Sequence, residues 1–239
     1  MNADFSLTPP FFELGPKAYM FGKQALDLAL FADELIVRYD VAIIMTPQYV
    51  DIEPIARATS KLLVFAQHMD PLPIGRGNGS VLPEAVKEAG AVGVLLNHAE
   101  RPLSPDILIE TIARADEVGL ASMVCAGSTE EVVAVARARP NIIIAEAPEL
   151  IGVGSTAPED RPDIAGINQL VWNIDPGIRI LHAAGISTGR DVYQIIAAGS
   201  EGSGSSSGVF KAKDPQAMLE EMISAVRRAW DAAHQPGEG

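Results

Sequence analysis

The chain has 239 residues, a formal net charge of −13 and a hydrophobic content of 48%. This apolar content supports a sizeable core, and the negative charge argues against a surface for nucleic acids or anionic membranes. The N-terminus lacks a basic region and a long apolar run, so we expect neither a signal peptide nor a membrane span. The single cysteine, Cys125, excludes an internal disulfide and suits a reducing, cytoplasmic location.

Apolar runs typical of buried strands alternate along the chain with segments of helical periodicity. Residues 1–10 form an irregular lead-in, where two consecutive prolines bar a helix. The expected strands cover residues 11–17, 41–46, 62–67, 92–98, 120–125, 142–146, 178–182 and 201–206. The expected helices cover residues 22–38, 51–60, 82–89, 104–118, 128–138, 163–173, 190–198 and 214–233. Residues 234–239 are expected to form a flexible tail.

Short polar residues mark three of the expected helix starts. Asp51, Ser128 and Asp214 are candidate caps, because their side chains can accept hydrogen bonds from free N–H groups. Residues 68–80 form a long loop rich in proline and glycine, and such loops are usually functional or lie at an interface. We expect this loop to pack on a neighbouring subunit of a dimer or tetramer.

Eight strand–helix units in one chain favour a closed (β/α)8 barrel over an open sheet. We therefore predict one α/β domain over residues 1–239, with the strands parallel and covered by helices. Lys17, His98 and Glu146 each stand at the C-terminal end of an expected strand. In such a barrel these ends form the active-site face, so we expect the three side chains to meet there.

The stretch from residue 142 to residue 154 concentrates residue types that acid–base chemistry needs. Glu146 follows four apolar strand residues, at a point where an unpaired charge is costly unless it serves as an acid or base. Gly152 and Gly154 in the next loop permit the close backbone approach of a loop that grips phosphate or moves. The alternative is a strand followed by a surface loop with two solvated glutamates, Glu146 and Glu149.

Six motifs follow the expected strands, at residues 16–19, 66–71, 96–101, 145–154, 184–187 and 206–214. Together and in this order they resemble the motifs of triosephosphate isomerases, particularly the shorter archaeal sequences, over nearly the whole chain. The resemblance implies a TIM barrel and the interconversion of glyceraldehyde 3-phosphate and dihydroxyacetone phosphate through an enediolate. It implies no cofactor, and the reaction belongs to glycolysis and gluconeogenesis.

The resemblance also implies residue roles. Glu146 matches the base that moves a proton between adjacent carbons, and His98 matches the neutral imidazole that polarises the carbonyl. Lys17 matches the cation that supports developing negative charge, and Glu100 a buried acidic neighbour that positions the lysine and the histidine. The phosphate is expected at turns formed by Gly152, Gly185, Ser187, Ser206 and Ser207.

Three environmental features are expected to support these roles. An apolar cover such as Ile151 would raise the pKa of Glu146. A helix beginning just after His98 would place a positive dipole end nearby and help to keep the imidazole neutral. The loop from Pro148 to Gly154 is expected to close during turnover, since an enediolate phosphate loses its phosphate in water.

The chain departs from the family where asparagine, proline and threonine usually stand, and these positions hold Gly15, Ala147 and Val153. Gly15 would open room for a longer or branched sugar phosphate, or weaken activity. The alternatives are therefore an isomerase of a four-carbon substrate such as erythrulose phosphate, or a phosphate-binding barrel with weakened or lost catalysis. An epimerase, or an aldolase that forms a Schiff base through lysine, is a third class.

The remaining candidates have structural interpretations. We expect His68 and His182 to be structural or loop residues, and Cys125 to behave as a small buried apolar residue. By composition, residues 203–207 read as either a flexible linker or a last strand that leads into a phosphate turn. His68, Asp70 and His98 lack diagnostic spacing for a metal, so no metal site is expected. The expected ligand is a small sugar phosphate.

Overall fold

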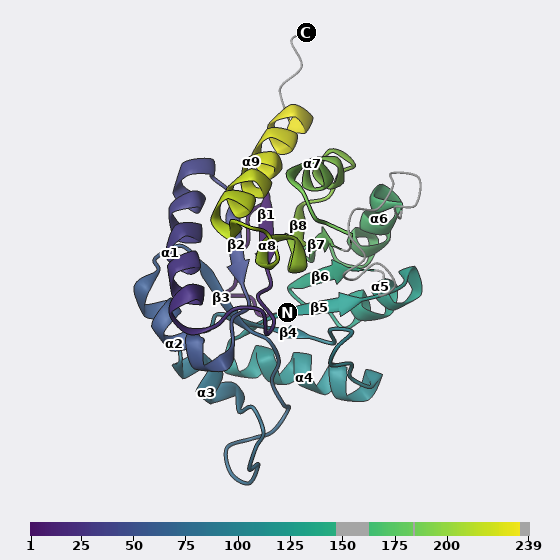
Figure 1. Ribbon diagram of the computed structural model, residues 1–239. Helices are drawn as coiled ribbons and strands as arrows, with labels where there is room; N and C mark the ends of the chain where they lie inside the picture. The colour runs from purple at the N-terminus through teal and green to yellow at the C-terminus, as the bar shows by residue number, and fades with distance from the viewer. Residues whose placement is uncertain (147–162, 184, 235–239) are drawn as a thin grey trace.

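The computed structural model describes residues 1–146, 163–183 and 185–234. Eight parallel strands pair in sequence order and close into a barrel, and the helices surround it (Figure 1). The strands are β1 (Phe11–Leu14), β2 (Ala42–Met45), β3 (Leu63–Ala66), β4 (Gly93–Leu96), β5 (Ala121–Ala126), β6 (Ile142–Ala145), β7 (Arg179–His182) and β8 (Gly202–Ser205). The prediction of a (β/α)8 TIM barrel is confirmed.

The helices follow the expected order, with one addition. They are α1 (Gly22–Tyr39), α2 (Tyr49–Ala58), α3 (Pro83–Glu88), α4 (Pro105–Val118), α5 (Thr129–Arg137), α6 (Ile164–Ile174), α7 (Gly189–Ala197), α8 (Ser207–Phe210) and α9 (Pro215–His234). The short α8 was not expected. Helix α9 includes His234, whose ring stacks on Trp230, and the rest of the expected tail lies outside the described residues. Within the described ranges, no helix is long and apolar enough to cross a membrane.

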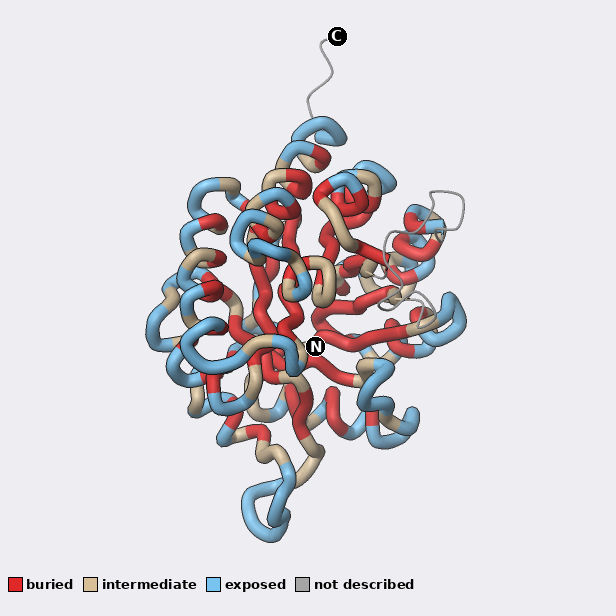
Figure 2. Tube along the Cα trace, in the orientation of Figure 1, coloured by how far each residue is buried: buried red, intermediate tan, exposed pale blue. Residues whose placement is uncertain are grey.

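Two hydrophobic cores lie on opposite sides of the strands. Alternate strand residues point to opposite faces, so Phe12 and Leu14 of β1 pack outward against the helices. Phe11 belongs to a second cluster that fills the barrel, together with Ile44 and Phe65. Figure 2 shows the buried residues gathered along the strands and on the helix faces that meet them. The barrel is therefore a packed scaffold that fixes the ends of its strands.

Two of the three expected helix caps are confirmed. The Ser128 and Asp214 side chains accept hydrogen bonds from N–H groups three residues on, at 3.2 and 3.1 Å, at the starts of α5 and α9. The expectation that Asp51 caps α2 is wrong, because that helix begins at Tyr49. The Asp51 carboxylate instead accepts a hydrogen bond from the N–H of Gly22, at 2.9 Å, where α1 begins. A side chain of α2 thus satisfies the N-terminus of the neighbouring helix.

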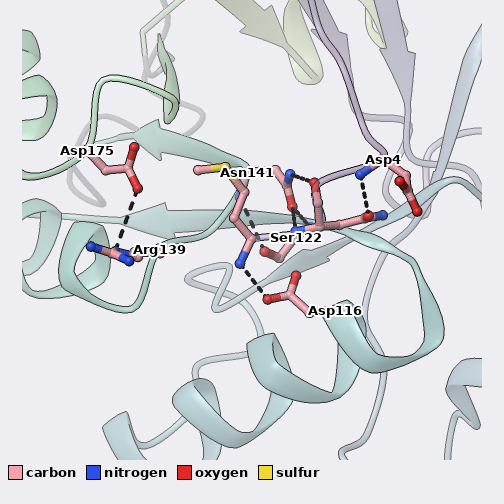
Figure 3. Close-up of polar contacts among 8 residues, drawn as sticks. Asp4, Asp116, Ser122, Arg139, Asn141 and Asp175 are labelled. Carbon is pink, nitrogen blue, oxygen red and sulfur yellow. Dashed lines mark hydrogen bonds and ion pairs between the residues drawn. The ribbon is translucent and has the colours of Figure 1, made fainter.

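The irregular lead-in of residues 1–10 packs against the amino ends of the strands. Leu7 is buried in the cluster inside the barrel, and the ring of Phe5 meets that of Phe65 edge-on, with centroids 5.9 Å apart. The Asn141 side chain forms hydrogen bonds with the backbone of Asn2 in the lead-in and with the backbone of Ser122 in β5 (Figure 3). These contacts close the end of the barrel that lies away from the candidate site.

The loop that joins β3 to α3 projects away from the barrel, below α3 in Figure 1, and Figure 2 shows its exposure. Ile74 in this loop is 73% exposed. The loop is anchored at its base, where the Asp70 carboxylate accepts a hydrogen bond from the N–H of Val81 at 2.7 Å. It therefore presents an apolar side chain to solvent from an ordered base.

Candidate active site

A cavity of about 460 Å³ lies at the carboxyl ends of the strands and is lined by Lys17, His98 and Glu146. These residues follow β1, β4 and β6, so elements distant in sequence deliver an ammonium, an imidazole and a carboxylate to one space. The volume suits a small ligand. The barrel thus brings together the three side chains that the sequence singled out.

The backbone of Lys17 is held in an unusual conformation. Its φ of 47° lies in the left-handed region, which is unfavourable for a residue with a side chain. Two side-chain amides donate to the Lys17 carbonyl oxygen, Gln48 at 2.6 Å and Gln67 at 3.0 Å. Gln67 also donates to the carbonyl of Thr46 at 2.9 Å. This glutamine clamp was not foreseen, although Gln67 lies within one of the six motifs.

Glu100 pairs with Lys17 but is not buried as expected. Its Oε1 lies 2.8 Å from the Lys17 Nζ, while its side chain is 63% exposed. The hydrogen bond and charge of Lys17 hold the pKa of Glu100 below its usual value. The exposure follows from the path of the chain, which forms a surface turn here instead of entering a helix.

His98 lies in a turn before helix α4, and burial together with this turn favours its neutral form. Helix α4 begins only at Pro105, and Pro102 disfavours helical geometry at the residue before it. The backbone N–H of Glu100 donates to His98 Nδ1 at 3.0 Å, so the proton of the neutral ring sits on Nε2. Burial, and then the charge of Lys17, lower the pKa of His98. The turn therefore fixes the tautomer.

Asn97 holds the turn that carries His98. Its φ is 57°, another left-handed conformation that asparagine tolerates better than most residues. Its amide nitrogen donates to the Cys125 carbonyl at 3.0 Å, and its amide oxygen accepts from the Leu103 N–H at 3.0 Å. One side chain thus ties the turn both to β5 and to the approach to α4.

Glu146 extends from the end of β6, where its N–H donates to the Ala126 carbonyl at 3.0 Å. Burial raises the pKa of its carboxyl group, and the positive charge of Lys17 opposes that rise. The group therefore has the raised basicity that proton abstraction next to a carbonyl needs. The expected cover Ile151, the phosphate residue Gly152, the family departures Ala147 and Val153, and the expected closing loop 148–154 all lie outside the described residues.

The expected phosphate residues after β7 and β8 line the same cavity, and they are Gly185, Ser187, Ser206 and Ser207. The two turns meet because the Ser205 hydroxyl donates to the Ile186 carbonyl at 3.1 Å. A Cβ on Gly208 would lie 2.7 Å from that same carbonyl oxygen, so this close approach requires glycine. The strand β8 also shows that the linker interpretation of residues 203–207 is wrong.

The hydrogen-bond donors at these turns differ in whether they already have a partner within the described residues. The Ser187 N–H already donates to the Asp191 carboxylate at 3.2 Å. The Ser206 hydroxyl is buried, and no hydrogen-bond partner reaches it from the part of the chain that the structure describes. A buried polar atom without a partner is unfavourable unless a ligand supplies one. Ser206 is therefore the donor most clearly open to a bound oxygen.

The other candidates take structural positions. Buried Cys125 has a thiol pKa raised well above its usual value by burial, which suits a packing residue. Buried His182 lies 2.8 Å from the Asn168 amide oxygen, and burial lowers its pKa to about 4. His68 pairs with Asp70 at 3.2 Å. Within the described ranges, no three or more His, Cys, Asp or Glu side chains gather to hold a metal ion.

The space beside Gly15, which was expected to admit a longer substrate, is partly occupied by another side chain. A Cβ added to Gly15 would lie 2.8 Å from Oε1 of Glu13, so a carboxyl group already fills the neighbouring space. Glu13 is buried and lines the cavity, yet it was not among the expected site residues. The signal for it was its spacing of two from Phe11, which places both side chains on the inward face of β1.

Comparison with known proteins agrees with this geometry. The family model described as triosephosphate isomerase matches residues 17–226. A triosephosphate isomerase of Saccharolobus solfataricus is 36% identical over 93% of this chain and 99% of its own. One from Methanobacterium bryantii is 40% identical over 86% of this chain and 91% of its own. One from Methanosarcina mazei is 36% identical over 91% of this chain and 99% of its own. The chain belongs to the triosephosphate isomerase family.

Proposed function

We propose that this protein interconverts glyceraldehyde 3-phosphate and dihydroxyacetone phosphate as an aldose–ketose isomerase. The observation that carries the proposal is the convergence of Lys17, His98 and Glu146 on one cavity at the carboxyl ends of the barrel strands. A base with raised pKa, a neutral hydrogen-bond donor and a cation are the groups that a proton transfer through an enediolate requires.

Glu146 acts as the base. Its carboxylate takes a proton from the carbon next to the substrate carbonyl, and the electron pair of that C–H bond moves to form the enediolate. The carboxylic acid then returns the proton to the adjacent carbon, and the hydroxyl proton passes from one substrate oxygen to the other. The carbonyl and hydroxyl groups thereby exchange places without net gain or loss of atoms. Triosephosphate isomerases as a class use a glutamate base with a neutral histidine.

His98 and Lys17 stabilise the enediolate. The Nε2–H of neutral His98 donates to the substrate oxygens, because Nδ1 is held as an acceptor by the backbone N–H of Glu100. The Lys17 ammonium offsets the negative charge that develops on those oxygens. Glu100 positions that ammonium through its 2.8 Å ion pair.

The phosphate group binds where the turns after β7 and β8 meet. Ser206 supports this assignment, since its buried hydroxyl has no partner among the described residues. Gly185, Ser187 and Ser207 line the same part of the cavity. Gly152 completes the expected set from outside the described residues. No cofactor enters the proposed reaction.

The decisive experiment measures turnover of triose and tetrose phosphates by the purified protein. We expect isomerisation of glyceraldehyde 3-phosphate in a coupled dehydrogenase assay, with deuterium from D₂O entering the product carbon. Erythrulose phosphate should react far more slowly, since Glu13 fills the space beside Gly15. Phosphate-ester binding without deuterium incorporation would refute the isomerase and favour a barrel that only binds.

We also propose that the protein assembles as a homo-oligomer, a dimer or tetramer, in the cytoplasm. The projecting loop 68–80 supports the assembly, because Ile74 is 73% exposed at a position anchored by Asp70. Light scattering at micromolar concentration should give a multiple of the 25.3 kDa chain mass. An Ile74→Asp variant should lower that mass, and a monomeric wild type would contradict the assembly. The reaction's place in glycolysis supports the location, which cell fractionation tests.

A further inference from the structure

Glu13 places a carboxyl group at the floor of the active-site cavity. It follows Phe11 on the inward face of β1, and it pairs in register with Gly204 of β8. Glu13 is only 9% exposed, and it lines the same cavity as Lys17 and Glu146. A charged residue type at this depth needs a reason, because burial without compensation is costly.

Two glycines make room for this carboxyl group. A Cβ on Gly15 would lie 2.8 Å from Glu13 Oε1, and a Cβ on Gly204 would lie 3.1 Å from Oε2. Larger residues at either position would displace the acid from its place. The Thr46 hydroxyl donates to Oε1 at 3.1 Å and fixes the orientation of the group. The carboxyl group is therefore seated in a fitted niche at the floor of the cavity.

The surroundings keep this acid protonated at neutral pH. Burial raises the pKa of Glu13 to about 8; the Thr46 hydrogen bond and the Lys17 charge lower it, and the Glu146 charge raises it. Cys125 on β5 also faces it, with a thiol whose own raised pKa keeps it neutral. The cavity residues from the turn after β7, from β8 and from the turn after β8 are uncharged. Below pH 8 the group is thus a neutral acid with one O–H to donate.

We propose that Glu13 is a further catalytic residue, whose protonated carboxyl group donates a hydrogen bond to a substrate oxygen on the reacting carbons. This inference rests on the proposed isomerase function. The donor strengthens its interaction as negative charge develops on that oxygen, so it favours the enediolate over the bound substrate. Glu146 and Glu13 are then two carboxyl groups of one cavity in different protonation states, one a base and the other a donor.

Two substitutions separate donation from packing. Glu13→Leu keeps the volume and removes the donor, and kcat should fall about 100-fold with a smaller change in KM, as for the loss of an oxyanion donor. Glu13→Gln keeps a donor, and its loss in kcat should stay below about tenfold. Equal losses in the two variants, or a Glu13→Leu enzyme within about threefold of wild type, would overturn the proposal.

The pH profile gives a readout that a packing role would not move. In the wild type, kcat/KM should fall above about pH 8, as Glu13 ionises, loses its donor and adds negative charge. Glu13→Gln should lack this alkaline limb. Thr46→Val should move the limb to higher pH. The Thr46 hydrogen bond lowers the pKa of Glu13 in the wild type, so its removal should raise that pKa. An alkaline limb that is the same in all three proteins would overturn the proposal.

A binding measurement covers the remaining outcomes. Phosphoglycolate carries a carboxylate in place of the charged enediolate oxygens, and calorimetry should show weaker binding to Glu13→Leu than to Glu13→Gln. If the wild type failed to turn over triose phosphates, the proposed function would fail, while this binding difference would still test the donor. Circular dichroism verifies the fold, and if Glu13→Leu does not fold, Glu13→Gln and Thr46→Val decide the question.

Discussion

Removing the glutamine clamp on Lys17 should weaken catalysis without removing any charged group from the cavity. The perturbation is Gln48→Ala, Gln67→Ala and the double substitution. Both amides donate to the Lys17 carbonyl, at 2.6 and 3.0 Å, and hold its backbone at a φ of 47°. Without them Lys17 should relax toward an ordinary conformation, and its ammonium should leave the position beside His98.

The magnitude follows from a comparison of strain with hydrogen bonding. A left-handed residue with a side chain costs about 1–3 kcal/mol. Each hydrogen bond to the Lys17 carbonyl contributes about 1 kcal/mol net, so the pair roughly offsets that strain. Losing one bond should lower the population of the working conformation about fivefold, and losing both about 30-fold.

Steady-state kinetics and urea unfolding test this reasoning together. Gln67→Ala should lose about 1 kcal/mol more stability than Gln48→Ala, since Gln67 also donates to the Thr46 carbonyl. Gln24→Ala, on the exposed face of α1, is the matched control and should change neither quantity. A double variant whose kcat/KM stays within about twofold of wild type would refute the clamp.

Three further outcomes are expected. Glu146→Gln should lower kcat by about 1,000-fold with KM little changed, and a loss below tenfold in the coupled assay would contradict a general base. Glu100→Gln should lower kcat/KM less than about fivefold, because the Glu100 side of its ion pair with Lys17 is largely exposed, and the loss should shrink as salt rises. The pKa of His182 is about 4 in the folded chain and near 6.5 in the unfolded chain. As pH falls, the unfolded chain therefore binds the proton at a higher pH than the folded chain does. The free energy of unfolding of the wild type, measured in urea, should therefore fall by up to about 3 kcal/mol more than that of His182→Gln as pH falls from 6.5 to 4. An equal pH dependence of the two proteins would contradict this prediction.

The fold could be predicted because most of the strands carry their own signal in the sequence. Apolar runs such as Ile142–Ala145 mark buried parallel strands, and the helices between them show clear periodicity. Strand β8 consists of glycine and serine and has no apolar residue. Only its place after the seventh strand and helix indicated a strand there. The short α8 and the true partner of Asp51 depend on contacts between elements, which no local pattern encodes.

The candidate site was predicted in its outline but not in its supports. Lys17, His98 and Glu146 stand at strand ends, so topology alone brings them together. The neutral state of His98 was expected from the dipole of the following helix, whereas the contributions seen in the structure are burial, the charge of Lys17 and a backbone N–H within a turn. Glu13 escaped notice because a glutamate between apolar neighbours reads as a strand residue, and its environment depends on two distant glycines.

The closed barrel has a consequence for how the chain assembles on the ribosome. Each strand pairs with the next one along the chain, and among the eight described strand pairs only β1–β8 joins distant segments. Neighbour pairing needs short loop closures and can proceed during synthesis, whereas the seam waits for the last strand. Until then β1 exposes an open edge that can pair with other nascent chains. A side chain at Gly202, where a Cβ would come 2.8 Å from Phe11, should therefore reduce the yield of native protein by delaying that seam.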